Sequence, residues 1–431
     1  KVDILYRITT GTRKRVGRVN IQGNTKSQDR VIRREVPMRP GEFYNSVDLE
    51  TTKRRLKNLG YFQDVQVTGA ASAQDGYRDV NILVQEQRTG TINFGLGFSS
   101  IDSILGRINL EQSNFDITNW GRFTGAGQRF SVNLQVGSQR TDFRVSLVEP
   151  WFLGQKLSLG TDLYYRDLIF LSPEYDQTNV GASVFLRKPV GRRSYVKGEY
   201  RVETIEIKAE SDTTQAFKDE EDKYLRSALS LNYVYDSRDS NQQPRSGHKV
   251  DLGLIYAGGL LAGDVDTLTF SGSGTKHWSL PFDTILTARG SFAVVDSHGG
   301  NKSIPIFERQ FLGGARDLRG FQFRDIGPRD DTGPNATQEV LGGATSVFGS
   351  LELTFPVIGQ VRGAVFYDTG FVNSDSWDFN TGRLASDVGV GVRLNLPGIG
   401  PLAVDFAIPV ETPDDQADDG SQIQFYMDYQ F

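Results

Sequence analysis

The stretch Gln422-Ile423-Gln424-Phe425-Tyr426-Met427-Asp428-Tyr429-Gln430-Phe431 ends the chain, and its pattern decides the fold. Every odd-numbered residue in it is apolar or aromatic, and most even-numbered residues are polar. Successive side chains of a β-strand point to opposite faces, so one face of this segment suits lipid and the other suits water. We therefore predict that it is a lipid-facing strand of a transmembrane β-barrel.

The same period of two residues recurs throughout residues 89–431. Apolar residues share one parity in the segments Ile92–Phe98, Phe130–Val136, Leu229–Tyr235, Val250–Tyr256, Val388–Leu394 and Leu402–Ile408, and the other parity is mostly Gly, Ser, Asn, Gln, Asp or Arg. A β-sandwich would also alternate, with its apolar face inward. The length of the pattern, the aromatic strand ends and the charged residues on the polar parity favour a mostly β fold with an antiparallel barrel of about sixteen strands.

Composition narrows the class of protein further. The chain has 431 residues, a formal net charge of −5 and a mean hydropathy of −0.38. Its uninterrupted apolar runs fall far short of the ~20 residues that a spanning helix needs, which excludes a helical membrane protein. The absence of cysteine excludes disulfides and thiolate metal sites. A pI near 5.5 gives no support to a nucleic-acid-binding protein.

Residues 14–88 follow a different pattern, with the element order β-α-α-β-β. The expected strands are Val16–Ile21, Phe62–Thr68 and Tyr77–Gln85, and the expected helices are Ser27–Glu35 and the stretch from Ser46 to Gly60. Ser46 suits the N-cap position of the second helix. Because each amphipathic element has a partner to pack against, we predict a small α+β domain. Residues 1–13 then look like the end of a preceding, truncated domain.

One long stretch, Ser297–Gly343, carries no strand pattern. A compact domain rarely contains so long a loop without a functional reason. Within it, Gly313-Gly314 precedes Leu318-Arg319-Gly320-Phe321. The loop is therefore the first place to look for a functional motif.

These residues carry a resemblance to a known family. The β-α-α-β-β unit resembles a POTRA domain, the periplasmic module of the BamA-type outer-membrane protein assembly superfamily. The tetrapeptide Leu318-Arg319-Gly320-Phe321 resembles the loop signature of that family, in which valine usually takes the first position. The segment Phe366-Tyr367-Asp368-Thr369-Gly370 is similar to its Phe-x-Asp-x-Gly strand motif. The resemblance implies a preceding POTRA remnant at 1–13, a POTRA domain at 14–88 and a barrel at 89–431.

The charge of Arg319 needs acceptors if the loop folds into the lumen, because a guanidinium stays charged and offers five donors. Asp368 has the polar parity of its strand and should point inward. We predict that a bidentate Arg319–Asp368 pair pins the loop to the wall, and that Gly320 lets the backbone approach closely. The alternative is a solvated arginine in an extracellular loop.

The first and last barrel strands should meet in a lateral seam. Its expected residues are Ile92, Phe94, Gly95 and Gly97 on one side, and Gln422, Gln424, Phe425 and Phe431 on the other. The resemblance implies that this seam opens and that its edge templates an incoming strand by β-augmentation. In the plainer interpretation the two strands merely close the barrel. Cysteines at Gly95 and Gln424 would test pairing across the seam.

The function that the resemblance implies is insertion of client β-barrel proteins into the outer membrane, with the POTRA domain in the periplasm. The implied partners are unfolded clients, periplasmic accessory lipoproteins and outer-membrane lipid, with no nucleic acid. The basic helix face of Lys53, Arg54, Arg55 and Lys57 could receive clients or lipoproteins, or could simply be solvated. The alternatives are a two-partner secretion transporter, a TamA-like factor and a passive porin.

No catalytic residue, metal site or cofactor is expected. His248, His277 and His298 are scattered and lack the spacing of metal ligands. The acidic pairs Asp414-Asp415 and Asp418-Asp419 lie in a polar connection, where a solvated turn is the favoured interpretation.

Overall fold

The computed structural model describes residues 12–99, 103–211, 213–241, 243–298, 303–330, 339–396, 400–414 and 420–427. Most of the predicted remnant at 1–13, the acidic residues 415, 418 and 419, and Phe431 lie outside these ranges. Within them, no helix has both the length and the apolar character that crossing a membrane requires. The chain forms two compact units, and the first combines the residues up to Ile92 with Leu110–Ser131 and Leu147–Pro150.

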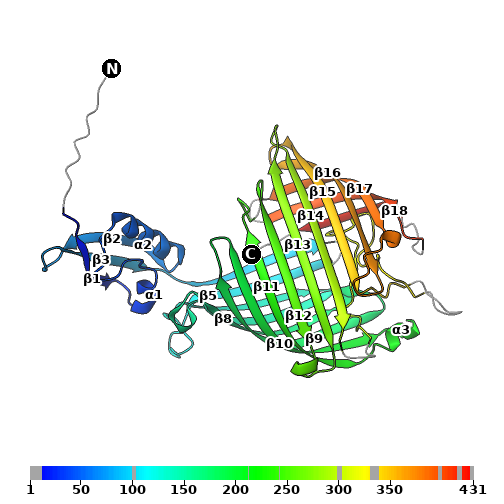
Figure 1. Cartoon of the computed structure of the whole chain (residues 1–431), viewed down its shortest axis with the longest axis horizontal. Helices are drawn as coiled ribbons and strands as arrows, with labels where there is room; N and C mark the ends of the chain where they lie inside the picture. The colour runs from blue at the N-terminus through cyan, green and yellow to red at the C-terminus, as the bar shows by residue number, and fades with distance from the viewer. Residues whose placement is uncertain are drawn as a thin grey trace, which may run out of the picture. The chain divides into compact units, whose positions relative to one another are not determined.

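The N-terminal part of the chain has the predicted β-α-α-β-β order. Its elements, shown in blue in Figure 1, are β1 (Arg15–Gln22), α1 (Asp29–Arg33), α2 (Ser46–Asn58), β2 (Phe62–Ala71) and β3 (Tyr77–Glu86). The sheet order is β1-β3-β2, with β1 parallel and β2 antiparallel to β3. Val16, Ile32, Leu56 and Val65 are fully buried between the helices and the sheet. This core explains why the two short helices stay folded, since helices of this length depend on tertiary packing.

The start of α2 differs from the prediction by one residue. The N-cap is Asn45, whose side chain accepts a hydrogen bond from the Val47 backbone N–H at 3.0 Å, and Ser46 is the first helical residue. Asn and Ser are about equally good caps, so residue type could not choose between neighbours. In the structure Asn45 has the extended backbone of an N-cap residue (φ −132°, ψ 124°).

We expect Asn45→Ala to lower the free energy of unfolding of this domain by about 0.5–2 kcal/mol, because one helix N–H loses its acceptor. Ser46→Ala is the matched control and should change it much less. Urea unfolding of the two variants, followed by circular dichroism, measures the difference. Equal losses in both variants would contradict the assignment of the cap.

In the part of the chain that the structure describes, sixteen antiparallel strands form the predicted barrel, neighbour by neighbour in chain order, with β19 beside β4. They are β4 (Gly90–Ser99), β5 (Ser103–Phe115), β6 (Gln128–Gly137), β7 (Arg140–Glu149), β8 (Ser158–Leu168), β9 (Tyr175–Pro189), β10 (Ser194–Ala209), β11 (Lys223–Asp236), β12 (Gly247–Ala257), β13 (Thr267–Ser279), β14 (Ile285–Ser297), β15 (Thr345–Ile358), β16 (Val361–Asn373), β17 (Ala385–Leu396), β18 (Gly400–Glu411) and β19 (Gln422–Met427). Short helices interrupt the connections: η1 (Phe152–Gly154), η2 (Ile169–Leu171), α3 (Gln215–Lys218), η3 (Gly259–Leu261) and η4 (Thr381–Arg383). In Figure 1 the colour passes from cyan at β5 through green at β10–β13 to orange at β17, following this order.

Burial alternates along the strands as the sequence predicts. On β18, Val404 and Phe406 are 39% and 41% exposed, whereas Asp405 between them is fully buried. On β17, Val388, Val390 and Val392 are likewise exposed. The apolar parity thus faces outward and the polar parity faces the interior, which is the arrangement of a membrane barrel and the inverse of a sandwich.

The register at the seam differs from the one expected. Tyr426 of β19 lies opposite Ser99 of β4. This antiparallel register does not place Gln424 opposite Gly95, so a cysteine pair at those two positions would not report on pairing. The hydrophobic pattern fixes which face a residue occupies, but a slip of two residues, or of any even number, leaves that pattern unchanged.

Candidate functional site in the barrel lumen

The loop between β14 and β15 is the long stretch without strand pattern, and its described part folds back on itself. Leu312 pairs with Ile326 as an isolated bridge. Gly313 has a φ of +109° and approaches the Gln322 carbonyl so closely that a Cβ would lie 2.3 Å from the carbonyl oxygen. Glycine is therefore required there. Leu312, Leu318, Phe321 and Ile326 pack with wall residues Phe348, Val372 and Ala385 into one buried cluster.

Arg319 is fully buried and binds the barrel wall through charge-assisted hydrogen bonds. Its Nε and Nη2 donate to the two carboxylate oxygens of Asp368 at 2.7 and 3.0 Å. Its Nη1 donates to Glu352 at 2.7 Å and to Asp405 at 3.3 Å. Burial lowers the pKa of Arg319, but the hydrogen bonds and charges of these carboxylates outweigh it and raise the pKa above its ordinary value. The structure thus brings together the two residues that the sequence paired.

The strand motif on β16 has a distinct contact for each of its inward positions. The Phe366 ring lies against the Arg319 guanidinium, with 3.3 Å between the ring centroid and Cζ. Asp368 binds the same guanidinium. At Gly370 a Cβ would lie 2.9 Å from the Leu312 side chain of the loop and 2.6 Å from the Val347 carbonyl. Positions i, i+2 and i+4 share one face of a strand, so these three residues together form the surface against which the loop packs.

Gly320 allows the loop backbone to approach β17 and β18. A Cβ at this position would lie 2.5 Å from the Cβ of Asp387 and 3.2 Å from the backbone nitrogen of Pro409. Asp387 is fully buried and lies opposite Asp368 on the neighbouring strand. The predicted close approach at Gly320 is therefore present, and its partners are these two strands.

Three members of the cluster were not predicted from the sequence: Glu352, Arg393 and Asp405. Arg393 of β17 donates to Glu352 at 2.7 Å and to Asp405 at 2.6 Å, so these carboxylates bridge the two arginines. A signal was available, because each residue is charged and stands on the inward parity between apolar outward neighbours. A charge in that position needs a partner in the lumen. The sequence does not say at which depth that partner lies.

The predicted seam residues differ in burial. Ile92 and Phe94 are 59% and 77% exposed on the outward parity of β4, while Gly97 is buried. Gly95, Gln422 and Phe425 are half-buried, and Phe431 lies outside the described residues. Gln424 is buried, and its amide donates to the Phe321 carbonyl at 3.2 Å. The last described strand is therefore bonded directly to the loop motif.

A second contact holds the loop to the opposite wall. Glu308 accepts a hydrogen bond from Arg226 of β11, and Arg226 also donates to Glu203 of β10 at 3.2 Å. Tyr164 of β8 donates to the same Glu203 at 2.9 Å. The loop thus crosses the lumen between two buried ion clusters.

Within the ranges that the structure describes, no group of three or more His, Asp or Glu side chains could hold a metal ion. Each histidine has a local partner: His248 stacks on Tyr235, His277 meets Thr287 at 3.0 Å, and His298 stacks on Tyr256. The three histidines thus contact three different residues.

Two family models match the chain. The model described as the Omp85 superfamily domain matches residues 122–431, and a POTRA model, described as a surface antigen variable number repeat, matches residues 14–87. The first model covers the lumenal cluster and the second covers the β-α-α-β-β domain.

Curated relatives match over almost the whole chain. The outer membrane protein assembly factor BamA of Nitratidesulfovibrio vulgaris is 26% identical over 433 residues, which cover 99% of this chain and 52% of that protein. The BamA of Neisseria meningitidis serogroup B is 25% identical over 423 residues, covering 93% of this chain and 51% of that protein. The chain thus spans about half the length of the curated relatives it matches.

Solved structures share the fold. The crystal structure of BamA from Haemophilus ducreyi lacking POTRA domains 1–3 has a TM-score of 0.83 at 24% identity, covering 97% of this chain and 84% of that one. CdiB from Acinetobacter baumannii has a TM-score of 0.60 at 14% identity, covering 97% of this chain and 74% of that one. At these identities the likeness concerns the fold alone.

Proposed function

Because this chain belongs to the Omp85 superfamily, whose domain model matches residues 122–431, we propose that it folds and inserts client β-barrel proteins into the outer membrane. It is an outer-membrane β-barrel protein with a POTRA domain in the periplasm. In the proposed mechanism the seam between β4 and β19 opens, and the edge of β4 templates the client strand through main-chain hydrogen bonds. The client's own folding free energy drives insertion, so the mechanism needs no catalytic residue or cofactor.

The seam itself carries this proposal. Along β18, partners for β19 run from Leu402 to Ala407, whereas among the described residues β4 meets β19 only where Ser99 faces Tyr426. Opening of the seam would separate these two strands and expose the edge of β4. A strand edge with unpaired donors and acceptors is a ready template for another chain.

We propose that the loop motif holds the strands on one side of the seam together. Arg319 bonds to β15, β16 and β18, Gly320 lies against β17, and Phe321 accepts a hydrogen bond from Gln424 of β19. Five consecutive strands, β15–β19, are thereby held to one loop. Opening would then move this wall as a block, while β4 remains as the template edge.

A disulfide across the seam tests the proposal. Because the chain has no cysteine, Ser99→Cys with Tyr426→Cys introduces one defined pair at positions that the register brings together. We expect the oxidised variant to lose insertion of a urea-unfolded client barrel into liposomes, and reduction to restore it. The measurement is the fraction of client that becomes resistant to protease.

The matched control is a cysteine pair at Val392 and Val404. These residues lie opposite each other on β17 and β18, and both are exposed on the outward face. Oxidation there should leave insertion unchanged, because these strands are held together in the proposed mechanism. Full insertion by the variant locked at Ser99 and Tyr426 would make lateral opening dispensable.

The rival functions make a different prediction. A passive porin or a two-partner secretion transporter should show a large, stable open pore in single-channel recordings. The buried motif at Arg319 and its packing against both walls support a lumen closed by the loop. We therefore expect low or unstable conductance.

The partners and the domain limits are also proposals. The POTRA domain, which we place at residues 14–88 with the barrel from residue 89, presents Arg54 and Lys57 as exposed cations on α2. These side chains suit acidic surfaces on unfolded clients or accessory lipoproteins.

A further inference from the structure

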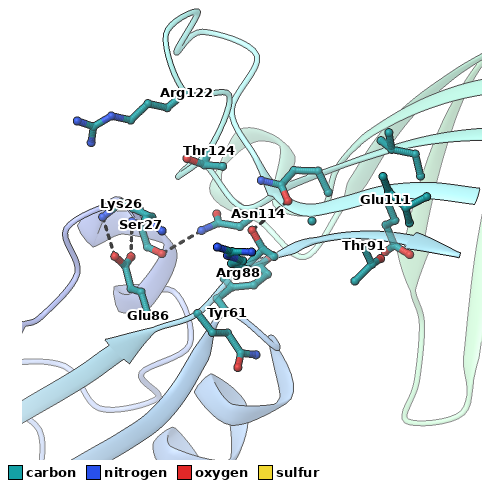
Figure 2. A pocket seen from close by; sticks show the side chains of 16 residues that line it. Lys26, Ser27, Tyr61, Glu86, Arg88, Thr91, Glu111, Asn114, Arg122 and Thr124 are labelled. Carbon is teal, nitrogen blue, oxygen red and sulfur yellow. Dashed lines mark hydrogen bonds between the residues drawn. The ribbon is translucent and has the colours of Figure 1, made fainter.

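A pocket of about 640 Å³ lies at the N-terminal end of β4, inside the first compact unit. Its walls come from the POTRA loop at Lys26 and Ser27, the segment from Glu86 to Ile92, and two stretches of the β5–β6 hairpin, residues 110–114 and 122–124. Figure 2 shows how these segments surround the pocket, with Arg88 at its centre and Asn114 and Tyr61 on either side. The lumenal site described above uses none of these residues.

Hydrogen bonds and a close backbone contact join the β5–β6 hairpin to the POTRA loop, so the two segments that line the pocket hold each other in place. Asn114 is buried and donates to the Ser27 hydroxyl at 2.9 Å, and Tyr61 donates to the Ser113 carbonyl at 2.7 Å. Gly125 has a φ of +127° and lies so close to the Lys26 carbonyl that a Cβ would be 2.3 Å from it. A side chain at Gly125 could not be accommodated without moving the backbone.

Three of the residues that line the pocket are cationic. Lys26, Arg88 and Arg122 are exposed, and no ion pair of the described residues involves their side chains. Of the two acids in the lining, Glu111 is drawn beside Thr91 in Figure 2, away from Lys26 and Arg88. The cations are therefore available to an anionic ligand.

The carboxylate of the other acid, Glu86, already accepts several hydrogen bonds. Its carboxylate accepts from the backbone N–H groups of Lys26 and Ser27 at 2.8 and 2.6 Å and from the Thr25 hydroxyl at 2.9 Å. Burial raises the pKa of Glu86, but these hydrogen bonds outweigh it and hold the pKa below its ordinary value. Glu86 thus shapes the loop that presents Lys26.

The direction of pairing decides which end of a strand reaches the pocket. β19 runs antiparallel to β4. A strand that takes its place on the β4 edge therefore runs toward Gly90, and its carboxyl end arrives where Gly90, Thr91 and Ile92 line the pocket. A strand can slip by two residues without turning its side chains to the other face, so the terminal group can settle at this depth.

We propose that this pocket binds the terminal α-carboxylate of the polypeptide strand that pairs with β4, through Lys26, Arg88 and Arg122. The inference rests on the proposed function and adds a recognition element for the chain end. An α-carboxylate is ionised at neutral pH and matches the unpaired cations. A strand that continued past Gly90 would instead have to turn within the pocket.

The probe is a synthetic peptide with the sequence of residues 422–431, prepared as the free acid and as the C-terminal amide, with a photoreactive benzophenone in place of Phe425. Binding to the full chain in nanodiscs of zwitterionic lipid is measured by fluorescence anisotropy. We expect the free acid to bind about three- to tenfold more tightly than the amide, as for exposed ion pairs acting together. The triple variant Lys26→Gln, Arg88→Gln, Arg122→Gln should bring this ratio to about one.

A matched triple variant, Lys14→Gln, Arg18→Gln, Arg39→Gln, removes the same charges from exposed POTRA positions outside the pocket and should keep the ratio. Equal affinities of acid and amide for the unsubstituted chain, or an unchanged ratio in the pocket variant, overturn the proposal. A second set of nanodiscs contains anionic lipid. It tests whether a lipid headgroup is the ligand of the pocket cations instead of the peptide carboxylate. If the pocket cations govern lipid-dependent affinity and leave the acid-to-amide ratio alone, the ligand is a headgroup and the proposal is wrong.

Crosslinking separates this inference from the proposed function. If both peptide forms crosslink to β4 with equal affinity, strand templating stands and only the carboxylate site fails. If neither form crosslinks to β4, templating and the carboxylate site fail together.

Discussion

Replacing Arg319 with alanine is expected to lower the free energy of unfolding by about 3–5 kcal/mol, the usual loss when one partner of a buried ion cluster is removed. The guanidinium is fully buried and compensates Asp368, Asp405 and Glu352. Without it, Arg393 remains as the only arginine among the cluster residues described above. The carboxylates must then stay charged in a dry site or take up protons, and either outcome costs free energy.

The measurement is urea unfolding in detergent, with protease sensitivity of residues 303–330 as a second reading of loop release. Asp368→Asn should cost less, because Arg319 keeps its bonds to Glu352 and Asp405. Arg319→Lys should fall between the two, since an ammonium cannot reproduce the forked geometry.

Arg316 supplies the control, because it is an exposed arginine in the same loop. Arg316→Ala should change the free energy of unfolding by no more than about 0.5 kcal/mol, as is usual for exposed positions. If Arg319→Ala behaved like Arg316→Ala, the cluster would not hold the loop.

Gly320→Ala is expected to destabilise the barrel by about 1–3 kcal/mol, because the added methyl overpacks a closed interior. Its Cβ would meet the Cβ of Asp387 at 2.5 Å and the backbone of Pro409 at 3.2 Å, and neither atom is the free end of a flexible side chain. The unfolded chain loses entropy on the same change, which offsets at most about 1 kcal/mol. Urea unfolding and the insertion assay should therefore both detect the substitution.

A double-mutant cycle locates the clash. Asp387→Gly removes the atoms nearest to the new methyl, so it should recover part of the loss in the Gly320→Ala background. Gly121→Ala is the control, since a Cβ there meets nothing within 4 Å. An additive cycle would place the effect of Gly320 somewhere other than the contact with Asp387.

The parity of each strand could be read from the sequence because it depends on neighbouring residues alone. Val404, Asp405 and Phe406 alternate in the chain, and the structure exposes the outer two and buries the middle one. The same local reasoning gave a barrel of about sixteen strands, the β-α-α-β-β domain and the inward direction of Asp368. Arg319 could be paired with Asp368 because a resemblance supplied a long-range contact that the pattern lacks.

The remaining features depend on alignment between strands, which no single strand encodes. Glu352, Arg393 and Asp405 meet because the stagger of β15, β17 and β18 brings their inward positions to one depth. That stagger follows from closing the sheet at a fixed shear and tilt.

Strand β19 has features that the sequence alone determined and features that depend on the whole barrel. Its alternation alone determined that Ile423 faces outward, where it is 67% exposed, and that Gln424 is buried. Only the tertiary structure decided that Tyr426 faces Ser99 and that Gln424 donates to Phe321. The physical reason is that parity is fixed by the geometry of one strand, whereas register and depth are fixed by the barrel as a whole.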